Sequence, residues 1–419
     1  MTVISPPPEA PRPSAGEERL DVEAQEALIK EARRRARRRQ MGYAASTLAV
    51  TAIVLAGFGV SHRGGGRGRQ SGESAAPSAA APISNLPANG VLAVEDRKSL
   101  DVTNPDRLFA VNGDGSGMRP LARCQGTRGD CYFGVGGYAW SPDGTRLAFL
   151  SGHFGGMITT TNLFLFVVNS DGTGLRRLAH CGVCDTSQNL SWSPDSRRIV
   201  FATGAVGSRN LIIVNAVTGA ERRLGPASDV VNPVWSPTGT RIAFGYGAAL
   251  FSIKADGSGI TQLALLDSVA NPSWSPDGTM ITFDAVNGIY VVDADGSHLK
   301  LLFSSPPDGG PSYPSWSPAG NRILFLDTPR VATGFAAEVW TMKPDGSGQR
   351  SLYRSPCCGL WSPPIWSPDG KAIAVGMSAY TAGGITRKGI LVMDAQGNHQ
   401  RRVFGNPEAI AWQPIPRTP

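Results

Sequence analysis

Carboxylates recur in this sequence at a regular spacing, within stretches that read Ala-Trp-Ser-Pro-Asp-Gly or close variants. The aspartates that share one place in these stretches are Asp143, Asp195, Asp277 and Asp369. A ring of acids or a metal site is one interpretation of this pattern. However, two other copies carry Thr238 and Ala319 at that place, and a chemical role would not survive these replacements, whereas a turn would. We therefore interpret the aspartates as turn residues, and we assign no catalytic residue, no metal and no cofactor.

Six cysteines offer a second kind of chemistry: Cys124, Cys131, Cys181, Cys184, Cys357 and Cys358. All follow a long apolar segment, and an even number of cysteines in an extracytoplasmic domain favours disulfides. The first two would close a short loop, whereas the adjacent last two can form only a strained bridge or pair elsewhere. The His-Cys-Gly-Val-Cys-Asp stretch 180–185 could instead be a redox or metal motif. A single C-x-x-C without a helix start or a matching second pair establishes neither.

The N-terminal part has the composition of a membrane anchor. Residues 42–60 run for 19 positions without a charge, which is about 28 Å of helix and enough to cross a bilayer. Seven basic residues lie in 30–39, and only Arg63, Arg67 and Arg69 follow closely. This asymmetry places the N-terminus in the cytoplasm and the rest outside the plasma membrane. A cleaved signal peptide would have an unusually long charged region, and no A-x-A-like site follows directly.

We accordingly predict a cytoplasmic tail over 1–40 (disordered, then a basic helix), a transmembrane helix over 41–61 and a flexible Gly/Ser/Ala/Pro linker over 62–88. The net charge of +7 belongs mostly to this part: residues 1–69 carry 12 Lys+Arg and 7 Asp+Glu, whereas the rest carries 28 and 26. The basic block 33–39 suits anionic headgroups better than nucleic acid. The remaining chain lacks the basic footprint of a nucleic-acid-binding protein, so we expect no nucleic-acid partner.

The elements that position the acids form a repeat of 39 to 52 residues, marked by Trp140, Trp192, Trp235, Trp274, Trp316, Trp366 and Trp412. Four strands are predicted within each period. In the fourth period the first strand ends at Trp274, and the other three cover 280–283, 288–293 and 299–302. Tight-turn sequences with Pro, Asp and Gly join the first pair and the last pair. A four-stranded sheet repeated radially is a blade of a β-propeller. The tryptophans are then packing residues between blades.

The stretch 271–279 (NPSWSPDGT), followed by 289–297 (IYVVDADGS), resembles the TolB-type, WD-repeat-like propeller family. The resemblance extends over about residues 89–416, in a membrane-anchored bacterial form, and implies the fold rather than an activity, because function in this family is diverse. The additional α/β domain of TolB has no counterpart in this sequence. The resemblance therefore transfers no partner contacts.

The two ends of the repeat predict how the ring closes. The first strands, over 90–94, 107–111 and 118–121, have no Trp strand before them, and the chain ends on a Trp strand over 409–412. Placing the last strand in the first blade removes an exposed sheet edge. We therefore predict a β-propeller of four-stranded blades over 89–416, with seven blades and one blade shared by both termini; six or eight blades are the alternatives.

Loop length separates the two faces of such a ring. The connections between second and third strands are long in the first blade (151–162), the fifth (327–338), the sixth (378–389) and the seventh (95–106), but short in the third and fourth. Variable loops on a rigid scaffold are where binding residues concentrate. The candidate ligand- or partner-binding residues on this arc are His153, Phe154, Arg330, Phe335, Trp361, Tyr380 and Arg387.

Three functions are compatible with these features. The first is a non-enzymatic scaffold that binds an envelope protein, a peptide or a glycan, because no G-x-S-x-G elbow, H-E-x-x-H motif or P-loop occurs. The second is an extracytoplasmic hydrolase or lyase that uses the propeller channel, with His153, Asp185 and Asp327 as candidates. The third is a transmembrane sensor that links outer ligand binding to the Arg-rich cytoplasmic tail.

Overall fold

The computed structural model describes residues 91–96, 107–123, 137–155, 159–182, 190–204, 209–225, 230–286, 288–305, 310–331, 334–335, 337–355, 358–360, 362–381, 384–403 and 407–414. Every regular element in these ranges is a β-strand. No helix in the described part is long and apolar enough to cross a membrane. The predicted tail 1–40, transmembrane helix 41–61 and linker 62–88 lie outside the described residues.

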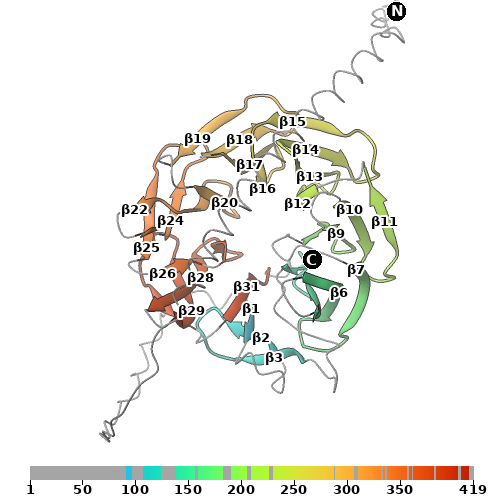
Figure 1. Cartoon of the computed structure of the whole chain (residues 1–419), viewed down its shortest axis with the longest axis horizontal. Coiled ribbons are helices and arrows are strands. Elements are labelled where there is room, and N and C mark those ends of the chain that lie inside the picture. Colours follow the sequence, from blue (N-terminus) through green and yellow to red (C-terminus); the bar gives the residue numbers. More distant parts are fainter. Residues whose placement is uncertain are drawn as a thin grey trace, which may run out of the picture. The chain divides into compact units, whose positions relative to one another are not determined.

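The strands form seven blades arranged as a ring, as predicted (Figure 1). Blade 1 is β4 (Tyr138–Trp140), β5 (Arg146–Gly155), β6 (Thr159–Asn169) and β7 (Arg176–Gly182). Blade 2 is β8 (Ser191–Trp192), β9 (Arg198–Thr203), β10 (Asn210–Asn215) and β11 (Glu221–Leu224). Blade 3 is β12 (Val230–Trp235), β13 (Arg241–Tyr246), β14 (Ala249–Lys254) and β15 (Thr261–Leu265). Blade 4 is β16 (Ala270–Trp274), β17 (Met280–Ala285), β18 (Gly288–Asp293) and β19 (Lys300–Ser304).

The last three blades are less regular. Blade 5 is β20 (Pro311–Trp316), β21 (Ile323–Asp327), β24 (Ala337–Met342) and β25 (Arg350–Ser355), with a separate hairpin of β22 (Arg330–Val331) and β23 (Gly334–Phe335). Blade 6 is β26 (Cys358–Leu360), β27 (Ile365–Trp366), β28 (Ala372–Thr381), β29 (Gly384–Asp394) and β30 (Arg401–Arg402). Blade 7 is β31 (Pro407–Trp412), β1 (Val91–Asp96), β2 (Arg107–Asn112) and β3 (Arg119–Arg123).

Blade 7 confirms that the two ends of the repeat share a blade. Strand β31 pairs antiparallel with β1, so that Trp412 lies opposite Leu92 and Ala411 opposite Ala93. The backbone N–H of Gln413 then donates to the carbonyl of Val91 at 2.9 Å. This pairing satisfies backbone groups that two open sheet edges would otherwise expose.

The core lies between neighbouring blades, because each sheet buries both of its faces. The second strands of five blades carry an almost fully buried phenylalanine at the same place: Phe149, Phe201, Phe244, Phe283 and Phe325. The repeated tryptophans pack beside them, and Trp140, Trp192, Trp235, Trp274 and Trp316 are all buried. Burial of such large apolar surfaces at every junction is the main force that holds the ring together.

Hydrogen bonds of several indoles link one blade to the blade before it. The Nε1–H of Trp192 donates to the carbonyl of Ala139 at 2.9 Å, and that of Trp274 donates to the carbonyl of Val234 at 3.3 Å. In each case the acceptor belongs to the residue just before the preceding tryptophan. The Nε1–H of Trp140 donates to the carbonyl of Ala411 in blade 7 at 3.3 Å, so one of these hydrogen bonds joins the first and last blades of the ring.

Candidate functional site

The antiparallel strands give the ring two faces of different construction. The turn face carries the turns between first and second strands and between third and fourth strands of each blade. The loop face carries the connections between second and third strands and the crossovers between blades. Functional candidates on the two faces can therefore be compared blade by blade.

The repeated aspartates organise turns on the turn face. In blade 4, Asp277 Oδ1 accepts hydrogen bonds from Ser275 Oγ at 2.5 Å, from the backbone N–H of Thr279 at 3.0 Å and from Thr279 Oγ1 at 2.8 Å. These bonds lower the pKa of Asp277, the contact with Ser275 most of all. The Oδ1 atom of Asp277 thus serves its own turn, which is a structural role for this carboxylate.

The copies without aspartate build the same turn with other oxygens. In blade 3, Thr238 Oγ1 takes the place of the carboxylate and lies 3.0 Å from Ser236 Oγ. In blade 5, where Ala319 replaces the aspartate, Ser317 Oγ instead donates to Asn321 Oδ1 at 3.1 Å. The requirement at this place is a hydrogen-bond acceptor within the turn, and a carboxylate is one of several that meet it.

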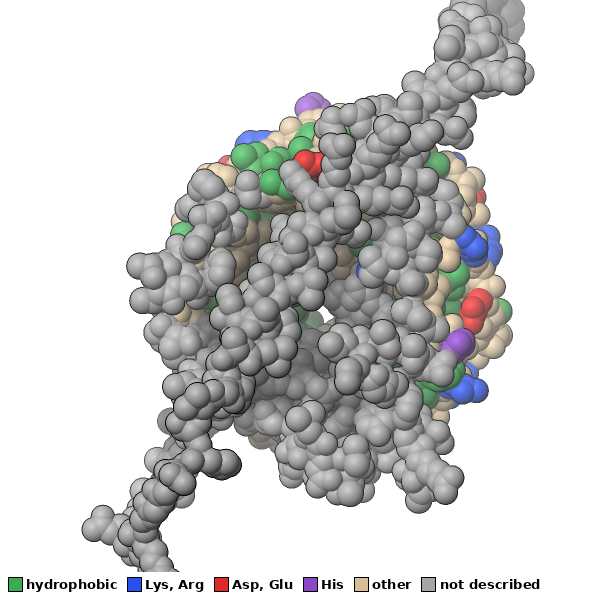
Figure 2. Space-filling model, in the orientation of Figure 1, with side chains coloured by type: hydrophobic (Ala, Val, Ile, Leu, Met, Phe, Trp, Pro, Cys, Tyr) green, Lys and Arg blue, Asp and Glu red, His purple; other side chains and the backbone are tan. Residues whose placement is uncertain are grey.

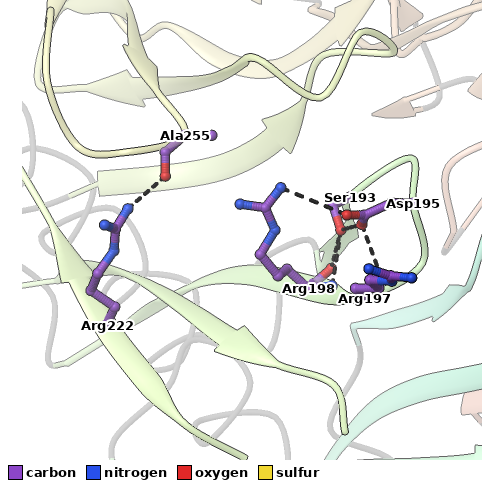
Figure 3. Close-up of polar contacts among 6 residues, drawn as sticks. All are labelled: Ser193, Asp195, Arg197, Arg198, Arg222 and Ala255. Atoms are coloured by element: carbon purple, nitrogen blue, oxygen red, sulfur yellow. Dashed lines mark hydrogen bonds and ion pairs between the residues drawn. The ribbon is translucent and has the colours of Figure 1, made fainter.

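A groove of about 550 Å³ lies between blades 2 and 3 on the turn face, and its lining includes Arg198, Arg222 and Lys254. Arg222 Nη2 donates to the carbonyl of Ala255 at 2.6 Å, and Arg198 Nη2 lies 3.8 Å from Asp195 Oδ2 (Figure 3). An equivalent groove of about 320 Å³ lies between blades 5 and 6. Because these arginines contact groups of their own blade or the next, we interpret both grooves as junctions between blades.

Two histidines of the turn face pair with aspartates at equivalent places. His298 Nδ1 lies 2.7 Å from Asp293 Oδ2 in blade 4, and His399 Nδ1 lies 2.8 Å from Asp394 Oδ2 in blade 6. The hydrogen bond and the charge of Asp293 raise the pKa of His298. Both pairs are exposed. Across the described ranges, no group of three or more His, Cys, Asp or Glu side chains is placed to hold a metal ion.

On the loop face, several segments predicted as long loops are largely strands. In blade 1, β5 and β6 are 10 and 11 residues long, and in blade 6 β28 and β29 are likewise 10 and 11 residues long. The corresponding strands of blades 2 to 4 have 6 residues each. The long connections continue the ladder of the blade because paired backbone groups need no other partners.

The structure places the backbone of most predicted binding residues on these hairpins. His153 and Phe154 lie in β5, at a shift of register with β6. Arg330 lies opposite Phe335 in the hairpin of blade 5. Tyr380 lies in β28 and Arg387 lies in β29. Trp361 and the enzymatic candidate Asp185 lie outside the described residues. Ligand binding by these side chains stays a prediction.

Two buried acids of blade 5 lie directly opposite each other. Asp327, at the end of β21, is 4% exposed, and its partner Glu338 in β24 is 7% exposed. Glu338 Oε1 lies 3.3 Å from Arg354 Nε, and its Oε2 accepts a hydrogen bond from Ser351 Oγ at 3.1 Å. Burial first, and then the charge of Glu338, raise the pKa of Asp327. Asp327 is one of the enzymatic candidates predicted from the sequence, whereas Glu338 is only the last residue of the predicted loop 327–338.

A third buried acid joins blades 4 and 5. Asp284 Oδ1 accepts hydrogen bonds from Asn271 Nδ2 at 2.9 Å and from the backbone N–H of Tyr313 at 3.1 Å. Burial raises the pKa of Asp284 to about 6, against the lowering effect of both hydrogen bonds. Asn271 and Tyr313 have φ of 48° and 56°, and each precedes a proline. Positive φ in residues other than glycine is uncommon and concentrates at functional or tightly constrained places.

The sequence carried a signal for Asp284 that our sequence analysis did not use. Aligned on the tryptophans, its place in the second strand is held by Leu150, Ala202, Gly245, Leu326 and Gly376 in the other blades that begin with a tryptophan strand. One acid among small or apolar residues marks a buried charge that needs partners.

Comparison with known proteins agrees with this architecture. The model of a family described as the TolB β-propeller domain matches residues 121–320 and 190–356. The chain belongs to this family. Because the matched ranges lie wholly within the ring, membership of the TolB β-propeller family concerns the repeat and leaves the residues before it unassigned. No curated protein matches the sequence significantly.

Several solved structures are similar to this TolB-type propeller. The periplasmic gluconolactonase of Pseudomonas aeruginosa is 13% identical, with a TM-score of 0.55 over 78% of this chain and 99% of the other. The oligogalacturonate lyase of Vibrio parahaemolyticus is 13% identical, with a TM-score of 0.51 over 76% and 87%. A putative TolB of Agrobacterium tumefaciens is 21% identical, with a TM-score of 0.43 over 56% and 87%. At these identities the first two show a shared fold and nothing about activity.

Proposed function

We propose that the chain is a membrane-anchored, extracytoplasmic propeller that binds an envelope protein, a peptide or a glycan on the loop face of blades 5, 6, 7 and 1. The observation that carries the proposal is the difference in strand length: 10 and 11 residues in blades 1 and 6 against 6 in blades 2 to 4. Hairpins that continue beyond a rigid ring present side chains without disturbing the core.

The proposed location is the outer side of the plasma membrane, with the N-terminus in the cytoplasm. The uncharged run 42–60 and the basic block before it support this topology. Cys181 is buried and disulfide-bonded, which fits an oxidising compartment. A fusion of a reporter that is active only in the cytoplasm tests the topology: it should be active at residue 38 and inactive at residue 90. Activity at both sites would contradict the anchor.

The binding role is tested by crosslinking in intact cells. One variant shortens 151–162 and 378–389 to the two-residue turn of blade 3, Gly247-Ala248. A matched control replaces the exposed turn Asp256–Gly259 on the opposite face by Asn-Gly. We expect the hairpin variant to lose crosslinked partners while the control keeps them, with both variants folded by circular dichroism. If the hairpin variant keeps the same crosslinked partners, the assignment of partner binding to this loop face is wrong.

An enzymatic role is the second candidate, and the buried acids of blade 5 favour it. Asp327 has a raised pKa and lies opposite Glu338, and such perturbed carboxyls are typical of general acids. Because similar propellers include a gluconolactonase and an oligogalacturonate lyase, lactones and oligogalacturonates are the first substrates to assay. Activity of the full chain that Asp327→Asn abolishes and Asp277→Asn spares would support an enzyme. If neither substrate class is turned over, the enzymatic candidate is rejected and the non-enzymatic binding function is retained.

A further inference from the structure

The chain enters the propeller on the turn face. Val91, the first residue of β1, lies opposite Asn112, and Asn112 begins the turn that closes β2 and β3. Leu92 lies opposite Trp412 at the end of β31, and Gln413 Nε2 then donates to the carbonyl of Gly144 in a turn of blade 1 at 2.6 Å. All these groups belong to the turn face. The segment that precedes Val91, and with it the predicted anchor, is therefore joined to this face and not to the loop face.

The turn face also carries an apolar rim, by which we mean Met118, Leu175, Val217, Ile260 and Leu299. These side chains are 41% to 59% exposed. Four of them directly follow the turn between third and fourth strands, and Val217 lies within that turn of blade 2. They come from five consecutive blades, 7, 1, 2, 3 and 4. Hydrophobic and basic side chains are visible at the edge of the ring in Figure 2.

Blades 5 and 6 interrupt the apolar rim with glutamine. Gln349 Nε2 donates to the carbonyls of Leu302 and Gly346, each at 3.0 Å. Gln400 Nε2 donates to the carbonyl of Gly397 at 2.8 Å. Glutamine at this place thus hydrogen-bonds to its own turn and, in blade 5, also to blade 4, whereas the apolar side chains of Met118, Leu175, Ile260 and Leu299 at the equivalent places cannot do so. The rim is an arc over five blades and not a complete ring.

We infer that the apolar rim rests on the phospholipid surface, so that the turn face is directed toward the bilayer and the loop face away from it. The inference rests on the proposed anchoring and deepens it. Equivalent turns of a propeller lie at one level, and side chains spread along that level match a plane better than they match a compact protein hot spot. Partly exposed apolar side chains of this kind insert at the boundary between headgroups and acyl chains.

Because the predicted linker would keep the propeller near the membrane, weak contacts between the apolar rim and lipid would be sufficient to orient it. The linker that the sequence predicts over 62–88 would, as a coil, have an r.m.s. reach of roughly 30 Å. Anchoring therefore holds the rim at a high effective concentration near the lipid, and the second contact becomes intramolecular. Aspartates such as Asp114 and Asp171 alternate along the rim with cations such as Arg119 and Arg176. Because the signs are mixed, the contact should not require anionic lipid, and zwitterionic vesicles are the appropriate probe.

The test uses the full chain reconstituted in phosphatidylcholine vesicles, with a photoreactive amino acid placed at one position at a time. Positions 118, 175 and 260 lie on the apolar rim. Positions 265 and 286 are matched controls, since Leu265 at the end of β15 and Val286 in the turn after β17 are exposed apolar residues on the loop face. We expect lipid adducts at the three rim positions, at least tenfold more abundant than at the two controls.

Carbonate extraction of the same vesicles tests the membrane anchor separately from the orientation of the turn face. If the chain stays embedded but rim and control positions react equally with lipid, or none reacts, the orientation is wrong and the anchor stands. If carbonate releases the chain, the anchor and the orientation fail together. A triple variant, Met118→Ser, Leu175→Ser, Ile260→Ser, should keep its thermal midpoint and stay embedded while protease cleavage at turn-face sites rises several-fold; unchanged cleavage would also overturn the inference.

Discussion

At the scale of single residues, the repeated aspartates show how a prominent motif can be structural. Asp277 is hydrogen-bonded to its own turn, and Thr238 has the same role in the preceding blade. We expect Asp277→Ala to lower the free energy of unfolding by about 1 to 2 kcal/mol, because two or three modest hydrogen bonds are lost. Asp277→Thr should recover at least half of this. Urea denaturation of both variants measures the difference, and a threonine variant as unstable as the alanine variant would contradict the turn role.

Asp284 predicts an unusual dependence of stability on pH. Its pKa is raised from 3.8 to about 6 in the folded protein, so between these values the folded state binds a proton that the unfolded state has released. The stability contributed by protonated Asp284 is therefore fully present below pH 4 and is lost as pH rises through about 6. A shift of this size corresponds to about 3 kcal/mol.

The comparison that isolates this effect is wild type against Asp284→Asn. The asparagine keeps an acceptor for Asn271 and Tyr313 but does not titrate. Measured by urea unfolding at pH 4 and pH 7, the advantage of wild type over the variant should be larger at pH 4. Parallel profiles for the two proteins would mean that Asp284 has an ordinary pKa.

At the scale of the elements, the tryptophan strands offer a matched pair. Trp192 and Trp235 are about equally buried, and an arginine of the preceding blade lies over each indole, Arg146 at 5.1 Å and Arg198 at 4.8 Å. Trp192 Nε1–H donates to Ala139, whereas Trp235 Nε1–H has no acceptor among the described residues. Trp192→Phe should therefore be less stable than Trp235→Phe by about 1 kcal/mol. Equal losses in thermal unfolding would assign the whole effect to packing.

The strands of the ring were predictable because short, mostly apolar runs recur between turn sequences that repeat. Three strands of blade 4 begin within one residue of the prediction, and the innermost strand ends at Trp274 as predicted. The long hairpins differ from the predicted loops because Thr159–Thr161 favours a strand and Gly383-Gly384 favours a hairpin turn, so that a long connection continues the ladder. The partners of the buried acids could not be predicted, because Asp284 contacts Tyr313 of the next blade and Glu338 contacts Ser351 and Arg354 of a neighbouring strand, and a single sequence does not show these contacts.

At the scale of the whole propeller, cooperativity depends on the shared blade. Strand β31 supplies the inner strand of blade 7, and its Ala411 accepts the indole hydrogen bond from blade 1. Gln413 adds a bond to Gly144. Each of the other blades contacts its neighbours through residues close in sequence, whereas this junction joins segments about 300 residues apart. Closing so long a loop costs conformational entropy, but this cost is incurred only once for the whole ring.

Removal of residues 406–419 should therefore affect the entire ring and not only one blade. The variant would leave β1 as an unpaired edge and expose the apolar surface that Ala411 and Trp412 cover, so we expect its Tm to fall by roughly 10 °C or more and aggregates to form. Removal of 415–419 alone is the control, because β31 and Gln413 remain, and it should leave Tm within about 2 °C of wild type. Calorimetry and size-exclusion chromatography measure both effects. A monomeric 406–419 deletion with an unchanged Tm would show that the ring is held by its other six junctions, and that the shared blade is dispensable for closure.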